Sequence, residues 1–400
     1  MLKTTKHLHR LAAEHAGIHA DRATRALIAI GVLLLALPAV SRLGDGQRPL
    51  PVDGPPPPVR YTVTDLGDGG ARFDSVSAHS INDRGQVACG ITAVAGAATF
   101  LWQNGRFTKL GPGRLIAPGR SLNNRGEVVG TATNGSWLPH VVIIRGGEAV
   151  DTGVLGYGYG IDDESRVVGL SRVNHHAFLY DRGKTIDLGT LGGVGSAAYQ
   201  INQRGQIVGT AELPTGQRHA FPQSGGETRE HPTAPVRPTA HAFLYSDGKM
   251  HDLGTLGGRI SSGCAINDRG WVAGLSYLSD GALRAFLFRN GKMEGLDDLA
   301  GMEYCFPYGI NSAGTIAGTA VKDQQTSFAI VWLGGRAYDL QDLIAPGSGW
   351  TLDGATSIND RGQITAQGTL AGERGIRSCV LTPVKNSRTP RAADWWRQVF

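Results

Sequence analysis

Short apolar runs of four to eight residues recur along this chain, and each is bounded by Gly, Asn or Asp. Runs such as "QIVGTA" (206–211) and "HAFLY" (176–180) are rich in β-branched and aromatic residues, which favours strands over helices. Polar turns separate them, and the string "SINDRGQ" occurs identically at 80–86 and at 357–363. The pattern predicts an all-β protein with many tight turns.

The turn string belongs to a repeat. Its seven copies are "INDRGQVACG" from Ile81, "LNNRGEVVG" from Leu122, "IDDESRVVG" from Ile161, "INQRGQIVG" from Ile201, "INDRGWVAG" from Ile266, "INSAGTIAG" from Ile310 and "INDRGQITA" from Ile358. Their spacings are 41, 39, 40, 65, 44 and 48 residues, and the long interval contains a second "HAF" 22 residues from the first. This regularity indicates a repeat architecture of seven units.

Units one to six each contain four short apolar runs, which is the pattern of a β-propeller blade. The seventh unit lacks a fourth run, whereas "YTVTDLG" (61–67) precedes the first unit and matches the fourth-run pattern "KTIDLG". We expect this N-terminal strand to pair with the last blade and close the ring, because closure removes exposed sheet edges. The predicted fold is a seven-bladed β-propeller of four-stranded antiparallel blades over residues 60–384, with an insertion at about 219–240.

The repeated turn residues are interpreted as structural. Asn and Asp side chains bond the backbone two residues on, and Gly accepts a left-handed conformation without steric cost. Ser165 replaces the turn Gly in the third unit. A second glycine follows the valines of the second run, where we expect a close approach of backbone or blades. It is Gly130, Gly169, Gly209, Gly274 or Gly318, and Cys89 and Ala366 take its place in units one and seven.

A binding function is sought in residues that differ between units. The position three before the turn Asn or Asp, on the predicted innermost strand, holds a large or polar residue in most units. Packing of one blade against the next explains large residues at this position, because they face small residues on the other side. The alternative is a polar, partly aromatic ring near one mouth of the channel. On that alternative the candidate ligand-binding residues are His79, Arg120, Tyr159, Tyr199, Tyr308 and Thr356, with Cys264 at the remaining place.

The two ends differ from the body of the chain. Five basic side chains precede the apolar run 26–40, which has the length of a secretory signal core and is short for a spanning helix. Residues 1–42 are predicted to be a signal peptide or an uncleaved helical membrane anchor outside the propeller, followed by a Pro/Gly-rich linker at 43–59. The basic and aromatic tail at 385–400 is either a membrane-interface segment or a disordered end. The expected location is periplasmic, cell-surface or secreted, with a tether to the inner membrane if residues 26–40 are retained.

Charge and chemistry narrow the function classes. The formal net charge of +5 comes from the ends, because residues 1–42 carry +4 and residues 384–400 carry +3, which leaves −2 for the body. We therefore expect no nucleic-acid partner. Motifs for phosphate, dinucleotide, zinc or a nucleophilic Ser are absent, so no cofactor, metal or catalytic residue is assigned. Four scattered cysteines allow disulfides, including Cys89–Cys379 at the ring closure.

The recurring series "HAFLY", "DLGTLGG" and "INxxGxVVG" resembles the HAF family of probable extracellular repeats of bacterial proteins. The nearest copies are 176–209 and 241–274, and looser units extend the resemblance over most of 61–384. The resemblance implies an exported repeat protein and supplies no catalytic residues. The predicted function is a non-enzymatic, monomeric binding scaffold for a protein, peptide or glycan. A channel-site hydrolase or lyase acting on extracellular polymers, and a structural cell-envelope protein, remain the alternatives.

Overall fold

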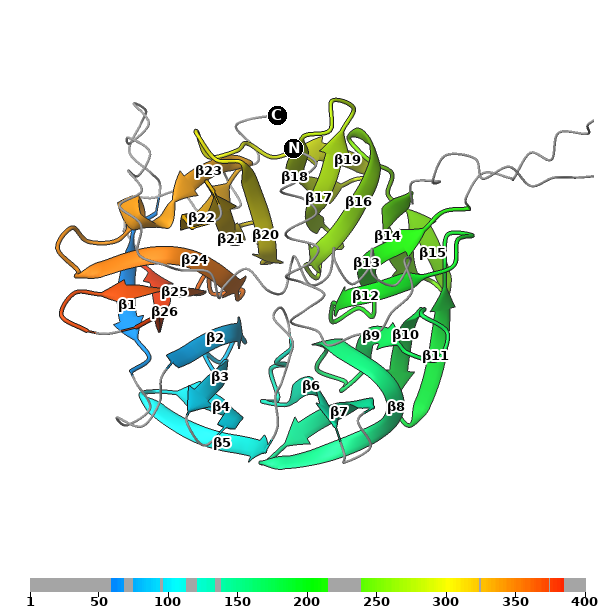
Figure 1. Cartoon of the computed structure of the whole chain (residues 1–400), viewed down its shortest axis with the longest axis horizontal. Helices are drawn as coiled ribbons and strands as arrows, with labels where there is room; N and C mark the ends of the chain where they lie inside the picture. The colour runs from blue at the N-terminus through cyan, green and yellow to red at the C-terminus, as the bar shows by residue number, and fades with distance from the viewer. Residues whose placement is uncertain are drawn as a thin grey trace, which may run out of the picture.

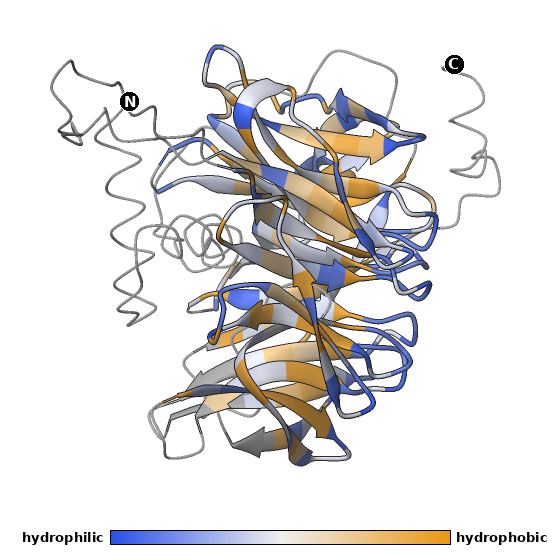
Figure 2. Cartoon of the chain, turned by 90° about the vertical axis from the view of Figure 1, so that its right-hand side faces the viewer, coloured by the Kyte–Doolittle hydropathy of each residue, from blue (hydrophilic) through white to orange (hydrophobic). Residues whose placement is uncertain are grey.

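The computed structural model describes residues 59–67, 75–93, 96–112, 121–133, 138–214, 239–323, 325–373 and 375–384. These residues are all-β apart from one 3-10 turn, η2 (Leu340–Leu343). Four-stranded antiparallel sheets are arranged around a central axis as a β-propeller (Figure 1). Hydrophobic residues follow the strands, and hydrophilic residues gather in the loops along one face of the ring (Figure 2).

Several sequence predictions lie outside the described residues: the helix at 26–40, the linker before residue 59, most of the insertion at 219–240, and the tail at 385–400. Within the described part of the chain, no helix has the length and hydropathy needed to cross a bilayer.

Three sheets have the predicted four strands. The first consists of β2 (Ser75–Ile81), β3 (Val87–Ala93), β4 (Gly96–Gln103) and β5 (Arg106–Pro112). The second consists of β20 (Tyr304–Ile310), β21 (Ile316–Val321), β22 (Ser327–Leu333) and β23 (Arg336–Asp339). The third joins β24 (Trp350–Ile358), β25 (Ile364–Leu370) and β26 (Arg377–Pro383) to β1 (Tyr61–Asp65).

A six-stranded sheet contains β6 (Val128–Thr133), β7 (Pro139–Arg145), β8 (Glu148–Ile161), β9 (Val167–Ser171), β10 (Ala177–Asp181) and β11 (Lys184–Gly189). It is continuous because β8 runs without interruption from the outer strand of unit two into the inner strand of unit three. The first half of β8 pairs with β7 and the second half with β9.

An eight-stranded sheet contains β12 (Ser196–Ile201), β13 (Ile207–Glu212), β14 (Ala240–Ser246), β15 (Lys249–Asp252), β16 (Gly257–Ile266), β17 (Val272–Leu278), β18 (Leu283–Arg289) and β19 (Lys292–Gly295). One parallel pair, Ala240 with Ile260, joins its two halves. The prediction of seven separate four-stranded sheets is therefore not met, because hydrogen bonding joins the described strands into five sheets.

The predicted closure by the N-terminal strand is confirmed. β1 pairs antiparallel with β26 from Tyr61 opposite Pro383 to Asp65 opposite Cys379. The two strands lie side by side in Figure 1, coloured blue and red. An ion pair of 2.7 Å between the Arg377 guanidinium and the Asp65 carboxylate adds to the strand pairing. The first and last described strands thus share one sheet, which leaves β26 without an open edge.

The core lies in layers between neighbouring units. The largest fully buried side chains include Phe178, Phe243, Phe286 and Trp332, one from the third strand of each of four units. Each such side chain contributes roughly 1.5–3 kcal/mol of stability relative to leaving it in water. All four cysteines are buried and free, so the structure contains no Cys89–Cys379 disulfide.

The predicted close approach is confirmed at four of the five second-strand glycines. A Cβ built on Gly169, Gly209, Gly274 or Gly318 would stand 1.9–2.2 Å from a carbonyl oxygen of the innermost strand. No side chain fits at that distance, so the backbone would have to move.

We expect Gly209→Ala to destabilise the protein by about 1–3 kcal/mol, because the added methyl group would overlap the carbonyl oxygen of Ala197 at 1.9 Å. Gly295→Ala is the matched control, since the nearest atom there is the flexible Arg284 side chain at 3.1 Å. Urea unfolding of both variants measures the difference. Equal stabilities would contradict the packing argument.

Candidate functional site

Seven turn residues lie around the axis at one mouth of the propeller and bond to one another. We call them the inner ring: Asn82, Asn123, Asp162, Asn202, Asn267, Asn311 and Asn359. In each asparagine, Oδ1 accepts the backbone N–H groups two and four residues on, which closes the turn. Nδ2 donates to the backbone carbonyl of the next ring member, at 2.8–3.3 Å in six of the seven steps. The last step, from Asn359 to Asn82, joins residues 277 positions apart.

A second ring lies beside the first: Asp83, Asn124, Asp163, Gln203, Asp268, Ser312 and Asp360. In six of seven steps the backbone N–H of one member donates to a side-chain oxygen of the next, at 2.7–3.0 Å. The carboxylates of Asp83, Asp163 and Asp360 accept a bond on each oxygen. These acids are therefore used to hold neighbouring units together.

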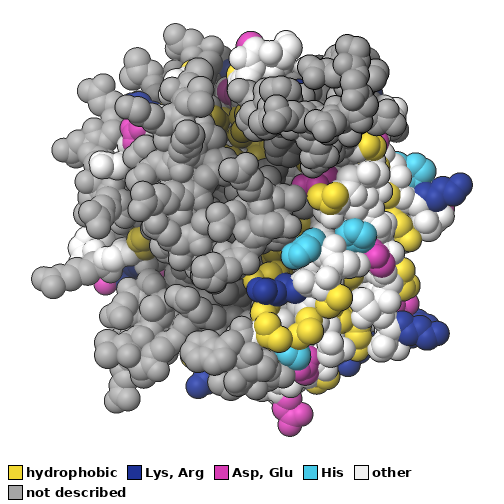
Figure 3. All heavy atoms as spheres, turned by 45° about the vertical axis from the view of Figure 1, so that its right-hand side comes forward, with side chains coloured by type: hydrophobic (Ala, Val, Ile, Leu, Met, Phe, Trp, Pro, Cys, Tyr) yellow, Lys and Arg dark blue, Asp and Glu magenta, His cyan; other side chains and the backbone are white. Residues whose placement is uncertain are grey.

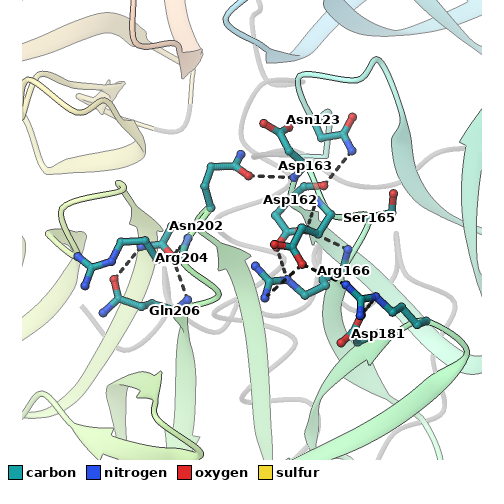
Figure 4. Close-up of polar contacts among 12 residues, drawn as sticks. Asn123, Asp162, Asp163, Ser165, Arg166, Asp181, Asn202, Arg204 and Gln206 are labelled. Carbon is teal, nitrogen blue, oxygen red and sulfur yellow. Dashed lines mark hydrogen bonds and ion pairs between the residues drawn. The ribbon is translucent and has the colours of Figure 1, made fainter.

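Unit three departs from this arrangement. The Asp162 side chain has no amide hydrogen to donate to the next unit, and its carboxylate instead pairs with the Arg166 guanidinium at 2.5 Å (Figure 4). Burial raises the pKa of Asp162 above its ordinary value, and the hydrogen bonds from Arg166 oppose that rise. Ser165 takes the left-handed conformation, with φ of 63°, and donates to Glu127 at 2.6 Å. The step from unit three to unit four depends on the second ring, through Asp163 N–H and the Gln203 side chain.

A pocket of about 450 Å³, counting space open to solvent, lies on the axis beneath these rings. Its floor is aliphatic and its rim consists of ring residues. The floor residues are Ile81, Leu122, Ile161, Ile201 and Ile358. None of the sequence-predicted ligand residues that the structure describes lines this pocket.

The candidate residues of the innermost strands sit at β-bulges. The strand register shifts by one residue at His79, Tyr159, Tyr199, Cys264, Tyr308 and Thr356. A bulge breaks the two-residue alternation and re-aims the side chain of the extra residue. These residues therefore do not follow the alternation that places every second side chain of a regular strand on one face. Arg120 lies outside the described residues.

The structure groups the tyrosines between neighbouring units. Tyr159 and Tyr199 have ring centroids 5.9 Å apart, and Tyr157 stacks on Tyr159. Tyr308 packs with Cys264 in the cluster between units five and six. Tyr159, Tyr199 and Tyr308 are each only 7–8% exposed, which agrees with the blade-packing interpretation.

Three polar groups at the bulges have no hydrogen-bond partner in the described structure: His79 Nδ1, the Tyr199 hydroxyl and the Tyr308 hydroxyl. Burial lowers the pKa of His79 to about 4 and raises the pKa of both tyrosines, so all three are neutral at pH 7. Thr210 opposes the rise at Tyr199 but lies outside hydrogen-bonding geometry with it. Thr356, in contrast, bonds to the Ala78 carbonyl at 3.0 Å and to Thr365 at 2.8 Å.

The histidines of the "HAF" strings have a structural role. His176 and His241 each place Nδ1 at 2.9 Å from the aspartate of the following "DLG", Asp187 and Asp252. Histidines are visible among acidic and basic side chains on one side of the ring in Figure 3. Among the described residues, no group of three or more His, Cys, Asp or Glu side chains is arranged to hold a metal ion.

Comparisons with known proteins find only distant structural similarity. No family model and no curated protein matches the chain. A puromycin-hydrolysing peptidase of Mycobacterium tuberculosis has 13% identity over 81% of this chain and 53% of its own, with a TM-score of 0.48. An acylaminoacyl peptidase of Pyrococcus horikoshii has 13% identity over 78% and 52%, with a TM-score of 0.47. A gluconolactonase of Xanthomonas campestris has 13% identity over 86% and 100%, with a TM-score of 0.39. The chain spans about half the length of the two peptidases, and these low scores support no inference about function.

Sequence reasoning missed the two rings. It explained the repeated Asn by its turn, but an Asx turn accepts Asp equally well. The preference for Asn in six of seven units was the available signal that the amide hydrogen has a partner. The second ring had no such signal, because its members differ in chemistry and share only a side-chain oxygen.

We expect Asn267→Ala to cost about 2–4 kcal/mol of unfolding free energy, because it removes two turn bonds and the bond to the Asn311 carbonyl in a fully buried setting. Arg204→Ala, at an exposed turn position, should change stability by less than about 0.5 kcal/mol. Urea unfolding compares the two. A loss below 1 kcal/mol at Asn267 would show that the inner ring contributes little.

Asp162→Asn combined with Arg166→Gln should restore the missing inner-ring bond to the Asn202 carbonyl. The pairs Asn82–Gln86, Asn202–Gln206 and Asn359–Gln363 provide the template, with amide bonds of 2.7–3.0 Å. We expect the double variant to be more stable than Asp162→Asn alone, by about 1 kcal/mol, because the single change leaves the Arg166 charge without its carboxylate. Thermal unfolding at pH 7 compares the double variant with Asp162→Asn. A single variant more stable than the double one would contradict the role assigned to the Asp162–Arg166 pair.

The depressed pKa of His79 predicts a loss of stability in acid. The unfolded chain binds a proton on His79 below about pH 6.5, whereas the folded protein binds it only near pH 4. Stability should therefore fall as the pH drops through this window, by about 1–3 kcal/mol, since the ring keeps partial exposure. Unfolding of the wild type and of His79→Gln at pH 7 and at pH 4.5 tests this. The variant should lose less, and equal losses would exclude His79 as the source.

Proposed function

We propose that this chain is an exported, non-enzymatic propeller that binds a protein, peptide or glycan at its innermost strands. The support is chemical. His79, Tyr199 and Tyr308 hold neutral groups that are buried and have no partner among the described residues, whereas the carboxylates of the second ring are engaged in hydrogen bonds. Neutral donors and acceptors suit uncharged polar ligands such as peptide groups and sugar hydroxyls.

We count the ring as seven blades. The inner ring has seven members, one per repeat unit, and its hydrogen bonds run from unit to unit and return to the first. The six-stranded and eight-stranded sheets then each combine two blades, through the long strand β8 and through the pair of Ala240 with Ile260. Bulges at equivalent positions in both halves of the eight-stranded sheet, at Tyr199 and Cys264, support the division.

Export is proposed from the basic and apolar segment at residues 1–42 and from the resemblance to HAF repeats. The hydrolase or lyase alternative has less support. Asp162 is paired with Arg166, and Asp163 accepts two bonds from Asn124, so neither has a free oxygen for acid–base work.

The experiment is a binding and turnover screen of the full chain against glycans, peptides and extracellular polymers, repeated with Tyr199→Phe and Tyr308→Phe. Loss of a hydroxyl without a partner should leave unfolding unchanged but weaken ligand binding about 3- to 10-fold. Tyr338→Phe, on the outer strand β23, is the control. Polymer cleavage by the wild type, or binding unchanged in both variants, would overturn the proposal.

A further inference from the structure

Two sets of turns share one face of the propeller, which we call the turn face. Within each unit the first strand ends at an inner-ring turn, the second returns, and the third runs back to the same side. The turn between third and fourth strands therefore lies beside the inner-ring turn. Three contacts between the two sets of turns agree with this placement. Gln86 donates to Gln103 at 3.1 Å, Arg145 pairs with Glu127 at 2.9 Å, and a Cβ on Gly362 would stand 3.3 Å from Pro383.

The turn face is basic although the body of the chain is not. The inner-ring turns place exposed arginines at one equivalent position in five units: Arg84, Arg125, Arg204, Arg269 and Arg361. The outer turns add six exposed cations: Arg106, Arg145, Arg182, Lys184, Lys249 and Lys292. The exposed acids on these turns are Glu148, Glu164, Asp247 and Asp360.

The acids of this face pair with some of its cations and leave others unpaired. Glu127 pairs with Arg125 and Arg145, Glu164 pairs with Arg182, and Glu294 pairs with Lys292. Asp83 and Asp163 are half-buried and accept bonds from neighbouring units, and Asp162 is fully buried. Within the described residues, Arg84, Arg204 and Arg361 form no ion pair. Their charges are free to meet an anionic partner.

Both ends of the described chain leave from the turn face. β1 begins there at Tyr61, opposite Pro383 at the end of β26, and Val384 N–H donates to the Arg60 carbonyl at 2.7 Å. In the sequence, the apolar run 26–40 precedes this point, and Trp395, Trp396 and Phe400 follow it among basic residues. Apolar runs and Trp beside Arg favour bilayers and their interfaces.

We propose that the turn face docks on an anionic lipid surface through its ring of arginines. A lipid surface is chosen over nucleic acid because both chain segments that continue from this face have lipid-preferring composition. Each Lys or Arg close to an anionic bilayer strengthens binding about fivefold. The opposite face, where the innermost strands begin, then stays open to solvent. This inference does not depend on the proposed ligand at Tyr199 and Tyr308.

The test is co-sedimentation of the full chain with vesicles of phosphatidylcholine alone and with added phosphatidylglycerol. The apolar run contributes to binding in both vesicle types. The ratio of the partition coefficient with phosphatidylglycerol to that without it therefore measures the contribution of the charged face. Arg84→Gln, Arg204→Gln and Arg361→Gln combined should lower that ratio on the order of 100-fold at an ionic strength of about 0.01 M, and less at about 0.15 M.

The control is Arg172→Gln, Arg259→Gln and Lys322→Gln, which removes three cations from the opposite face: two in the connections after β9 and β21, and one near the start of β16. Urea unfolding confirms that both triple variants are folded. An equal fall of the ratio in both variants would overturn the proposal, because net charge alone would then explain it. Wild-type binding to duplex DNA without preference for phosphatidylglycerol would also overturn it, in favour of a nucleic-acid surface.

Discussion

The hydrogen bond from the side-chain amide of one turn asparagine to the backbone carbonyl of the next holds the units of this propeller together at the axis. The apolar packing between neighbouring units has no direction and does not by itself fix an angle between sheets. The amide bond is directional, buried and repeated, so it sets the spacing from unit to unit. The same asparagine closes its own turn through Oδ1. Local turn and ring geometry are therefore determined by one side chain.

The other elements follow from this constraint. Inner strands that converge on the ring approach closely, and Gly160 and Gly309 have backbone atoms of the next unit within about 3.1 Å of where a Cβ would stand. The bulges at Tyr199 and its equivalents shift the strand register before the turn, and Gly209 and its equivalents leave room for the displaced carbonyl. Large side chains at the bulges then fill the wedge between units, which explains why Tyr199 and Tyr308 are buried yet keep unpaired hydroxyls.

Sequence reasoning reached the features that depend on local periodicity. The turn, the close approach at Gly169 and the closure through Tyr61 each left a repeated or complementary string. It did not reach features that depend on distant neighbours. The merger of units two and three through β8 depends on how β7 and β9 pair with the two halves of "EAVDTGVLGYGYGI", which the string alone does not show. The use of the second-ring aspartates depends on residues 39 to 277 positions away. The net charge did not indicate the basic turn face, because it counts buried carboxylates and exposed arginines equally. Neutral tyrosines at bulges cannot be distinguished from packing residues without the geometry of the fold.

The propeller combines a hydrogen-bonded axis with two surfaces that we propose to be functional, namely the unpaired groups of the innermost strands and the arginines of the turn face. Its central claim is that the turn residues are structural and cooperative with the whole fold. Native-state hydrogen exchange of the backbone amides of Asp83, Asn124, Gln203 and Asp360 tests this most directly, since each donates to a neighbouring unit. If the rings hold the propeller together, these surface-turn amides should exchange only through global unfolding, with the free energy measured by urea. Exchange at the rate of ordinary exposed turns would contradict the claim.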